Sequence, residues 1–329
     1  MKPKQAAPQI AVLGVGQLGS RYVQGLLTGT EPLDIWLQDP AINSESEFDS
    51  WRKIYGINTG HHSVNLSTNS KESPDHLSLV ISATTADVRY ESLNVFLNGK
   101  TFDYLILEKL LTTRLEDLEG LAEMAQWGKE CWVNHSFRLF PHYQQLKTKL
   151  HTVGRMEIIV EGTQWNLASN SSHYIDLARW LTDEHLVDLD CSLVEREWQN
   201  SKRSGYLEFT GILTCHYSKG SKLVMESRPV AENEPACPLK ISIRSSLGDV
   251  VIDEGAGTVE GSLLKEDLQG KYWHQSELTS DLVGEILETG QCRLPTFQDV
   301  QEDHATYLNE LLAYQRRVHL NFSQSVRIT

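Results

Sequence analysis

The chain has 329 residues, enough for two domains, and its 44 Asp and Glu residues outnumber its 30 Lys and Arg residues. With a formal net charge of -14, the chain lacks the excess of basic residues that is typical of nucleic-acid-binding proteins. Anionic lipid surfaces would repel a protein of this charge. We therefore expect a partner that is neither nucleic acid nor membrane.

The cellular setting is indicated by what the sequence does not contain. No apolar run reaches the roughly 18 residues of a membrane span, and residues 1–9 lack the apolar segment of a signal peptide. The five cysteines are scattered and form no CxxC pair, which is typical of structural thiols in a reducing compartment. We expect a cytoplasmic protein without a metal site. The adjacent His61 and His62 indicate a surface loop, because no cysteine or spaced carboxylate accompanies them.

A nucleotide-binding turn is predicted near the start of the chain. A short apolar run, typical of a buried parallel strand, leads directly into the pattern G-x-G-x-x-G, and apolar residues at helical spacing follow. In such a turn Gly14 permits the tight bend, Gly16 lets a pyrophosphate approach the backbone, and Gly19 lets the helix pack closely on the strand. The N–H groups of the helix N-terminus then face the phosphates. The predicted cofactor contacts here are Gly14, Gly16, Gln17, Leu18 and Gly19.

An acidic residue follows at the distance expected of a ribose-binding group. Asp39 ends a second apolar strand, about 20 residues after the last glycine. A carboxylate there accepts hydrogen bonds from the ribose 2′-hydroxyl and repels a 2′-phosphate, which favours NAD, with NADP as the alternative. Two plainer interpretations stay open: a glycine turn that binds no ligand, and an Asp39 that only forms a turn before Pro40.

Strands and helices alternate over the first part of the chain. Further buried strands are predicted at 77–83, 104–107 and 131–133, and helices at 87–97 and 115–125. This alternation predicts an α/β fold with a doubly wound parallel sheet, in a dinucleotide-binding Rossmann domain at 1–134. Ligands bind at the carboxyl ends of such strands. The residues at two of these ends are Ala83, Thr84, Thr85, Glu108 and Lys109.

Short segments of alternating hydrophobicity dominate the rest of the chain. Leu213, Cys215 and Tyr217 would share one face of a strand, and the loop 218–221 is typical of a hairpin. We therefore expect a second, α+β domain at 135–329 with a mostly antiparallel sheet. It would end in a helix at 297–316, and packing of this helix back on the first domain is an alternative.

Four motifs occur in an order that is specific to one family. The segment 83–85 (Ala-Thr-Thr) is similar to an Ala-Thr-Pro segment beside the nicotinamide, and 108–109 resembles a Glu-Lys-Pro motif in which Leu110 replaces the proline. The segment 138–141 is similar to an Arg-Phe-x-Pro stretch, and 172–181 resembles a helix that contains a histidine. Over nearly its whole length the chain resembles the glucose–fructose oxidoreductase / inositol dehydrogenase / rhizopine-catabolism (Gfo/Idh/MocA) family.

The resemblance implies a Rossmann domain followed by an α+β domain with a large, open, mostly antiparallel sheet. It implies an NAD(P)-dependent oxidoreductase that moves a hydride between nicotinamide and a hydroxyl or carbonyl carbon of a sugar, a cyclitol or a sugar derivative. The open sheet of such proteins commonly packs against a neighbouring subunit, so we expect a homo-oligomer, a dimer or a tetramer. The amide-rich segment 165–172 also resembles a branch of the family associated with surface-polysaccharide sugar pathways.

Three residues are expected to carry catalysis. The ammonium of Lys109 can donate to the substrate oxygen, and partial desolvation can lower its pKa toward neutrality, with Glu108 pairing with it or orienting it. His173 and Asp176 lie one helical turn apart, so His173 would be an acid/base or a donor, and Asp176 its orienter or a substrate contact. A surface Glu-Lys pair and a structural His-x-x-Asp are the alternatives.

One departure from the family precedes this histidine. The family has an aspartate at the position of Ser169, and a serine cannot act as a carboxylate base. The neighbouring Asn170 can hydrogen-bond a hydroxyl but cannot take its proton. Either Lys109 and His173 therefore handle the proton alone, or the substrate differs, or activity has been lost.

Three further residues are expected to contact substrate: Arg138, Trp165 and Asn170. An arginine suits a carboxylate or phosphate group, and Trp165 could stack on a sugar ring. The alternatives are a salt link between domains for Arg138 and packing in the core between the domains for Trp165. At the level of the whole chain, the alternative to a sugar-type oxidoreductase is a non-catalytic sensor or regulator of the same fold that binds the dinucleotide without turnover.

Overall fold

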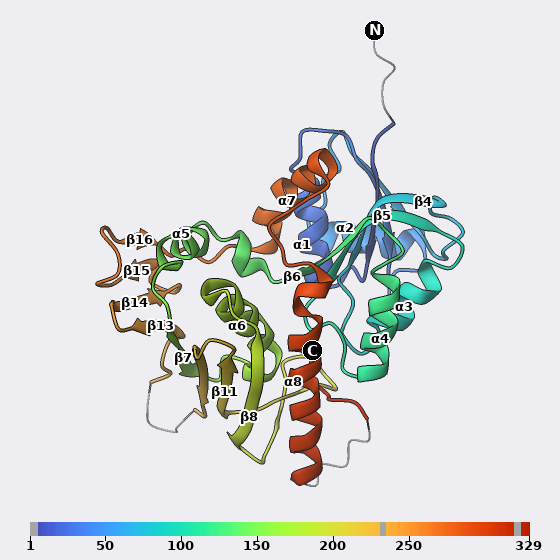
Figure 1. The fold of residues 1–329 in the computed structure, drawn as a ribbon. Helices are drawn as coiled ribbons and strands as arrows, with labels where there is room; N and C mark the ends of the chain where they lie inside the picture. The colour runs from blue at the N-terminus through green and yellow to red at the C-terminus, as the bar shows by residue number, and fades with distance from the viewer. Residues whose placement is uncertain (1–5, 231–234, 319–323) are drawn as a thin grey trace. The chain divides into compact units, whose positions relative to one another are not determined.

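In the computed structural model, which describes residues 6–230, 235–318 and 324–329, contacts divide the chain into two units. Unit 1 comprises Met1–Thr112, Glu116–Asn134 and Trp273–Asp299. Unit 2 comprises Thr113–Leu115, His135–Tyr272 and Val300–Thr329 (Figure 1). Apart from residues 113–115, the chain passes from unit 1 to unit 2 after residue 134, and residues 273–299 return to unit 1.

Unit 1 is built on a six-stranded sheet with the order β3-β2-β1-β4-β5-β6, in which every neighbouring pair is parallel. Its strands are β1 (Gln9–Leu13), β2 (Asp34–Gln38), β3 (Ser63–Leu66), β4 (His76–Ser82), β5 (Thr101–Glu108) and β6 (Glu130–Asn134). Its helices are α1 (Gln17–Leu26), α2 (Glu45–Ile54), α3 (Arg89–Phe96), α4 (Leu115–Met124) and α7 (Gln275–Thr289). This strand order is that of dinucleotide-binding folds, and it confirms the predicted doubly wound parallel sheet.

The late helix α7 joins unit 1 because it packs against the first helix, α1. A Cβ atom placed on Gly25 of α1 would lie 2.7 Å from the Cβ of Thr279 and 2.8 Å from the backbone oxygen of Ser276. Only a glycine lets the two helices come so close. Figure 1 shows the two helices side by side, although more than 240 residues separate them in the sequence.

Unit 2 contains an eight-stranded sheet with the order β16-β15-β14-β13-β7-β12-β11-β8. Its strands are β7 (Glu157–Thr163), β8 (Leu186–Val194), β11 (Gly211–Tyr217), β12 (Lys222–Arg228), β13 (Lys240–Ser245), β14 (Gly248–Asp253), β15 (Thr258–Glu260) and β16 (Leu268–Gln269). Of the pairs between these strands, β7–β12 is parallel and the others are antiparallel, so the predicted mostly antiparallel sheet is confirmed. A separate two-stranded ribbon pairs β9 (Gln199–Asn200) with β10 (Leu207–Glu208).

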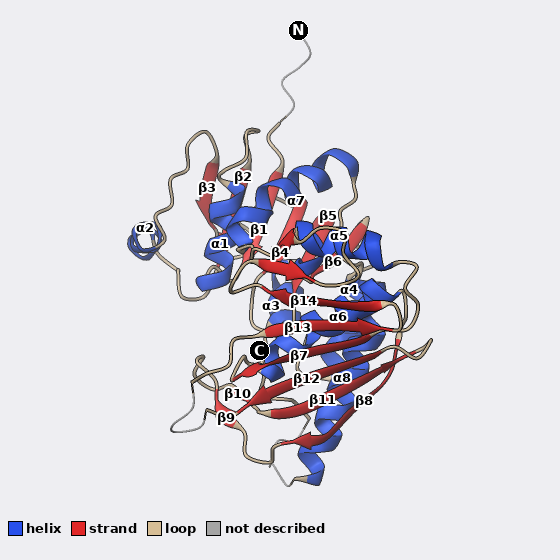
Figure 2. Cartoon of the chain, turned by 90° about the vertical axis from the view of Figure 1, so that its left-hand side faces the viewer, coloured by secondary structure: helices blue, strands red, loops and turns tan. Residues whose placement is uncertain are grey.

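Helices cover one face of this sheet and leave the other open. Figure 2 looks onto the open face, with α6 (Leu167–Thr182) and α8 (Phe297–Arg317) behind it. Along β11 the side chains of Leu213, Cys215 and Tyr217 are buried against the helices, as their alternation predicts. The short helices η1 (Ser136–Leu139) and α5 (Pro141–Leu150) connect the end of unit 1 to this sheet in the chain.

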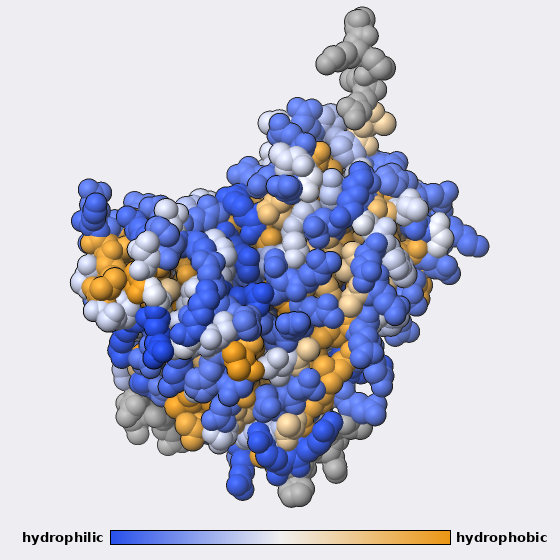
Figure 3. All heavy atoms as spheres, viewed as in Figure 1, coloured by the Kyte–Doolittle hydropathy of each residue, from blue (hydrophilic) through white to orange (hydrophobic). Residues whose placement is uncertain are grey.

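The described residues contain neither a membrane-spanning helix nor a metal-binding cluster. None of their helices has both the length and the apolar composition needed to cross a bilayer. Within the same residues, no three His, Cys, Asp or Glu side chains are grouped so that they could hold a metal ion. On the face drawn in Figure 3, hydrophilic residues predominate and apolar residues form separate patches.

Candidate functional site

The glycine turn after β1 has the shape of a phosphate cradle. Gly14 has a φ of 78°, which other residues rarely adopt, and a Cβ there would lie 2.9 Å from the amide nitrogen of Thr84. A Cβ on Gly19 would lie 1.9 Å from the carbonyl oxygen of Gly14. A Cβ on Gly16 would meet no atom within 4 Å. The turn is therefore crowded on the protein side at Gly14 and Gly19 and open at Gly16, as a bound pyrophosphate requires.

The start of α1 offers backbone donors to this open side. Gly16 is the N-cap, so no side chain caps the helix, and its first turn contains no acidic residue. The N–H of Ser20 makes the first intrahelical bond, to the carbonyl of Gly16, 2.9 Å away. The preceding N–H groups, including those of Gln17 and Leu18, thus lie where a helix N-terminus binds an anion. The residues present fit a dinucleotide.

Asp39 lies beside this turn at the end of β2. One carboxylate oxygen accepts a hydrogen bond from the N–H of Val15 at 2.7 Å, and the other accepts one from the N–H of Ala41 at 2.9 Å. The hydrogen bond from Ala41 forms the turn that was the alternative interpretation of Asp39. The hydrogen bond from Val15 holds the same carboxylate against the glycine loop. Carboxylate oxygens keep further lone pairs for ribose hydroxyls after two such bonds.

A buried polar network lies at the carboxyl ends of β5 and β6. Glu108, the last residue of β5, accepts hydrogen bonds at 2.5 Å from the hydroxyl of Tyr22 and at 2.5 Å from the amide of Asn134. Asn134 also donates to the side chain of Gln275 at 2.8 Å. Burial and the nearby Glu108 hold the pKa of Tyr22 well above its usual range, so this hydroxyl stays a proton donor. Glu108 is thereby fixed directly before Lys109, and the peptide bond that follows Lys109 is cis.

In unit 2 the N-terminus of α6 holds a carboxylate that comes from a distant strand. The side chain of Glu208, in β10, accepts hydrogen bonds from the N–H groups of Ala168 at 2.8 Å and Ser169 at 3.4 Å. A glutamate from another strand therefore accepts hydrogen bonds from two N–H groups in the first turn of this helix. Since this N-terminus is already paired with an anion, it is a poor place for an anionic substrate group.

Aromatic rings flank His173, one turn further along α6. The ring of His135 lies edge-on at a centroid distance of 5.5 Å, and that of Phe137 lies at 5.0 Å. Both residues come from the segment that directly follows β6. His135, a buried imidazole beside a candidate catalytic one, was not predicted from the sequence. No sequence motif marks it, because the two rings are 38 residues apart in the chain.

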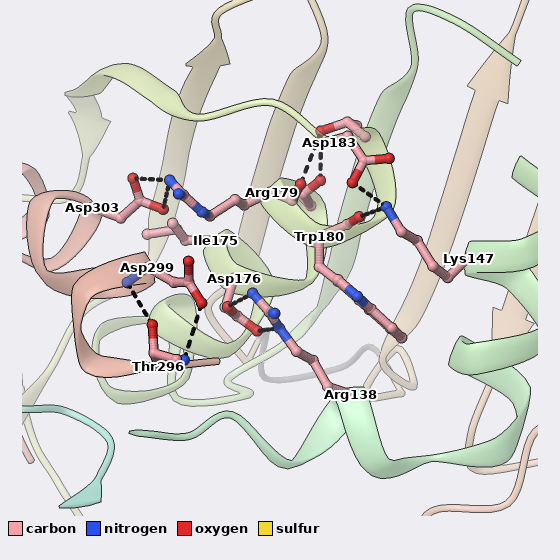
Figure 4. Close-up of polar contacts among 12 residues, drawn as sticks. Arg138, Lys147, Ile175, Asp176, Arg179, Trp180, Asp183, Thr296, Asp299 and Asp303 are labelled. Carbon is pink, nitrogen blue, oxygen red and sulfur yellow. Dashed lines mark hydrogen bonds and ion pairs between the residues drawn. The ribbon is translucent and has the colours of Figure 1, made fainter. Parts of the chain in front are cut away.

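The same segment is tied to α6 by an ion pair (Figure 4). The guanidinium of Arg138 donates to both carboxylate oxygens of Asp176, at 2.9 Å and 2.6 Å, and it lies 5.7 Å from the ring centre of Trp180. The Asp176 side chain is 2% exposed and that of Arg138 is 11% exposed. Two parallel hydrogen bonds from a guanidinium to a carboxylate hold η1 against α6. The pair lies within unit 2, so the salt link left open for Arg138 does not join the two units.

The other residues expected to contact substrate, Trp165 and Asn170, make hydrogen bonds within unit 2. Trp165 is 8% exposed, and its indole N–H donates to the carbonyl of Glu226 at 2.7 Å. Trp165 is therefore packed within unit 2. The amide of Asn170 donates to the backbone carbonyl of Trp165 at 3.0 Å, which stabilises the first turn of α6.

Comparison with known proteins gives the fold. No protein-family model and no curated protein matches the sequence. Among solved structures, UDP-N-acetylglucosamine 3-dehydrogenase from Acidithiobacillus ferrooxidans is 14% identical with a TM-score of 0.69, over 95% of this chain and 99% of that one. The transcriptional regulator Gal80p from Kluyveromyces lactis is 13% identical with a TM-score of 0.72, over 95% of this chain and 93% of that one. The fold is that of the Gfo/Idh/MocA oxidoreductases.

A third structure with this Gfo/Idh/MocA fold contains ligands. Myo-inositol dehydrogenase from Lactobacillus casei, solved in complex with NAD(H) and myo-inositol, is 15% identical with a TM-score of 0.65, and 96% of each chain is covered. At identities this low the similarity shows the fold alone. The Gfo/Idh/MocA fold is shared by dehydrogenases and by a transcriptional regulator, so activity has to be argued from the residues.

Proposed function

We propose that this protein is an NAD-dependent oxidoreductase that transfers a hydride between nicotinamide and a hydroxyl or carbonyl carbon of a sugar, a cyclitol or a sugar derivative. The observation that carries the proposal is the glycine turn, crowded at Gly14 and Gly19 and open at Gly16, with the carboxylate of Asp39 hydrogen-bonded to its backbone. It is supported by the fold shared with a structure that holds NAD(H) and myo-inositol. The carboxylate of Asp39 favours NAD over NADP, which carries a 2′-phosphate.

The nicotinamide supplies the hydride chemistry when the cofactor is bound, and the residues of the chain handle the proton. In this proposal Lys109 donates a hydrogen bond to the oxygen of the reacting carbon and stabilises negative charge that develops there. His173 takes or returns the hydroxyl proton, in a ring orientation that His135 and Phe137 hold by packing. Asp176 acts through Arg138, which anchors η1 on the helix that carries His173.

The substrate is proposed to be a neutral polyhydroxyl compound. Arg138 was expected to accept a carboxylate or a phosphate, but its guanidinium already donates two hydrogen bonds to Asp176. Glu208 likewise pairs with the N-terminus of α6. A sugar of a surface-polysaccharide pathway is one such compound. We further propose a cytoplasmic homo-oligomer, a dimer or a tetramer, that uses the open face of the sheet in unit 2.

The test begins with the cofactor. Purified protein, shown to be free of bound nucleotide, is titrated with NADH and separately with NADPH while nicotinamide fluorescence is recorded. We expect tighter binding of NADH, followed by NAD reduction with a member of a panel of neutral sugars and cyclitols. Lys109→Met and His173→Asn should each lower turnover with that compound by about 100-fold or more. Failure of both nucleotides to bind would contradict the proposal.

A second function, that of a dinucleotide sensor, is favoured by two observations. Ser169 stands where the family has an aspartate, and the fold is shared with the regulator Gal80p. A dinucleotide sensor would bind NADH without turnover, whereas the enzyme would reduce NAD with at least one compound of the panel. Steady-state turnover that depends on Lys109 therefore separates the two functions.

A further inference from the structure

We propose that Arg89 is a positioning residue for the candidate cofactor site, because its guanidinium joins the loops that follow β4 and β5 and so fixes the backbone on which Lys109 is carried. This inference rests on the role of Lys109 in the proposed function. Its first test below does not need a substrate, so the two can fail separately.

Arg89 is a cation in the interior of unit 1. It lies in the first turn of α3 and is 1% exposed, the largest fully buried side chain among the described residues. Burial lowers the pKa of Arg89 to about 10, while the nearby Glu108 and Tyr22 act in the opposite direction. The guanidinium is therefore charged near neutral pH. A buried charge of this kind needs several hydrogen-bond partners to be tolerated.

The partners of Arg89 come from two different loops. One nitrogen donates to the carbonyl oxygens of Leu110 and Leu111, at 2.8 Å for Leu111, just after β5. The other terminal nitrogen donates to the carbonyl oxygen of Thr84, just after β4. A planar guanidinium can serve both loops at once because its donors point in fixed, diverging directions. A lysine has a single nitrogen and cannot span the same carbonyls.

The backbone on both sides of Lys109 is thereby held. Before it, Glu108 is fixed by the hydroxyl of Tyr22 and the amide of Asn134. After it, the carbonyl of Leu110 is fixed by Arg89. The aim of the Lys109 side chain therefore depends on three buried contacts that do not involve its own ammonium. A displacement of the reacting groups by about 1 Å can cost 100-fold in rate.

Arg89 also reaches the glycine turn through one neighbour. Thr84, whose carbonyl it binds, is the residue whose amide nitrogen would lie 2.9 Å from a Cβ on Gly14. The cradle itself is built from the backbone of β1 and α1, which Arg89 does not contact in the bonds described. We therefore expect replacement of Arg89 to affect the reaction step more than the binding of the dinucleotide.

The first test reads Lys109 directly. Trace labelling with acetic anhydride between pH 6 and 11, followed by mass spectrometry, gives the reactivity of the Lys109 amine as a function of pH. Arg89→Lys should move this pH profile by about half a unit or more. The matched control is Lys100→Met. Lys100 donates to the carbonyls of Ser73 at 2.8 Å and Pro74 at 2.9 Å, so it also holds a loop of unit 1, at the amino ends of β4 and β5. That variant should leave the profile of Lys109 unchanged.

The second test separates chemistry from binding. With the compound identified in the sugar and cyclitol panel, Arg89→Met should lower kcat by about 100-fold, and Arg89→Lys by about tenfold, while the Kd for NADH changes less than about threefold. Lys100→Met should lose thermal stability but keep kcat. If Arg89→Met does not fold, Arg89→Lys decides. A folded Arg89→Lys with unchanged kcat and an unchanged Lys109 profile would overturn the inference, as would equal losses of kcat and NADH affinity with an unchanged profile.

Discussion

The glycine turn of unit 1 and the helix α6 of unit 2 carry the candidate functional groups in opposite ways. At the glycine turn the functional groups belong to the backbone. Three glycines within six consecutive residues, Gly14, Gly16 and Gly19, determine where the backbone packs closely and where it stays open. On α6 the side chains are the functional groups, and their partners Arg138, His135 and Glu208 come from other segments. A site made of backbone can be recognised as a motif, whereas a site made of side chains depends on distant neighbours.

The strongest test of this comparison is Gly19→Ala in the backbone site. The added methyl group would lie 1.9 Å from the carbonyl oxygen of Gly14, and neither backbone can give way without moving β1 from α1. We expect a loss of roughly 3 kcal/mol of stability in urea unfolding, together with loss of NADH binding. Gly16→Ala is the matched control, since its methyl group meets no atom within 4 Å.

The Gly16→Ala control distinguishes a glycine needed for close packing within the protein from one needed for access of the pyrophosphate. Gly16→Ala is expected to keep its stability within about 1 kcal/mol and to weaken NADH binding about tenfold, because the methyl group occupies the side that a pyrophosphate approaches. Equal stabilities and equal NADH affinities of the two variants would show that the turn is not a cradle.

The side-chain site should respond to loss of one partner. Asp176→Asn leaves the guanidinium of Arg138 buried without its anion, and we expect a loss of about 3 kcal/mol in urea unfolding. The control is Asp183→Asn. Asp183 is 64% exposed and pairs with Lys147, so its loss should cost less than about 1 kcal/mol. Similar losses in the two variants would mean that burial does not set the strength of these pairs.

A second carboxylate packed near α6 predicts a dependence on pH. Burial raises the pKa of Asp303 from 3.8 to about 6, and Arg179 at 3.3 Å only partly offsets this. Because the folded state binds the proton more tightly than the unfolded state, stability should fall as the pH rises from about 4 to about 6, by up to about 3 kcal/mol. Thermal unfolding across this range measures the effect, and Asp303→Asn should remove that part of the slope. A slope that persists in the variant would assign it to other groups.

The smallest effect is expected for a substitution of Asp39, beside the glycine turn. Asp39→Ser removes the negative charge that would face a 2′-phosphate and shortens the side chain that reaches Val15. We expect the ratio of NADPH to NADH affinity to rise about tenfold in fluorescence titrations, with a stability change below about 1 kcal/mol. An unchanged ratio would mean that Asp39 only forms the turn with Ala41.

The secondary structure that could be predicted is the part with a strong local pattern. The strands β1, β4 and β5 each contain a short apolar run, and the alternation in β11 matches its buried face. The helix α7 was not predicted, and its membership of unit 1 depends on the close approach to Gly25 of α1, more than 240 residues away. The strand β3 was missed as well. It is a short edge strand without a buried side chain, so it has little hydrophobic pattern.

The residues of the candidate site likewise fall into those with a local sequence pattern and those whose partners are distant in the chain. From the sequence came the cradle, Asp39, and the order of motifs that places Lys109 and His173, because each depends on residues that are near one another in the chain. Only the tertiary structure decided that Arg138 binds Asp176, that Trp165 is buried, and that Arg89 holds the backbone around Lys109. The physical reason is that a backbone turn is specified by local sterics, whereas the partner of a buried charge or ring is set by which distant segments the fold brings within hydrogen-bonding distance.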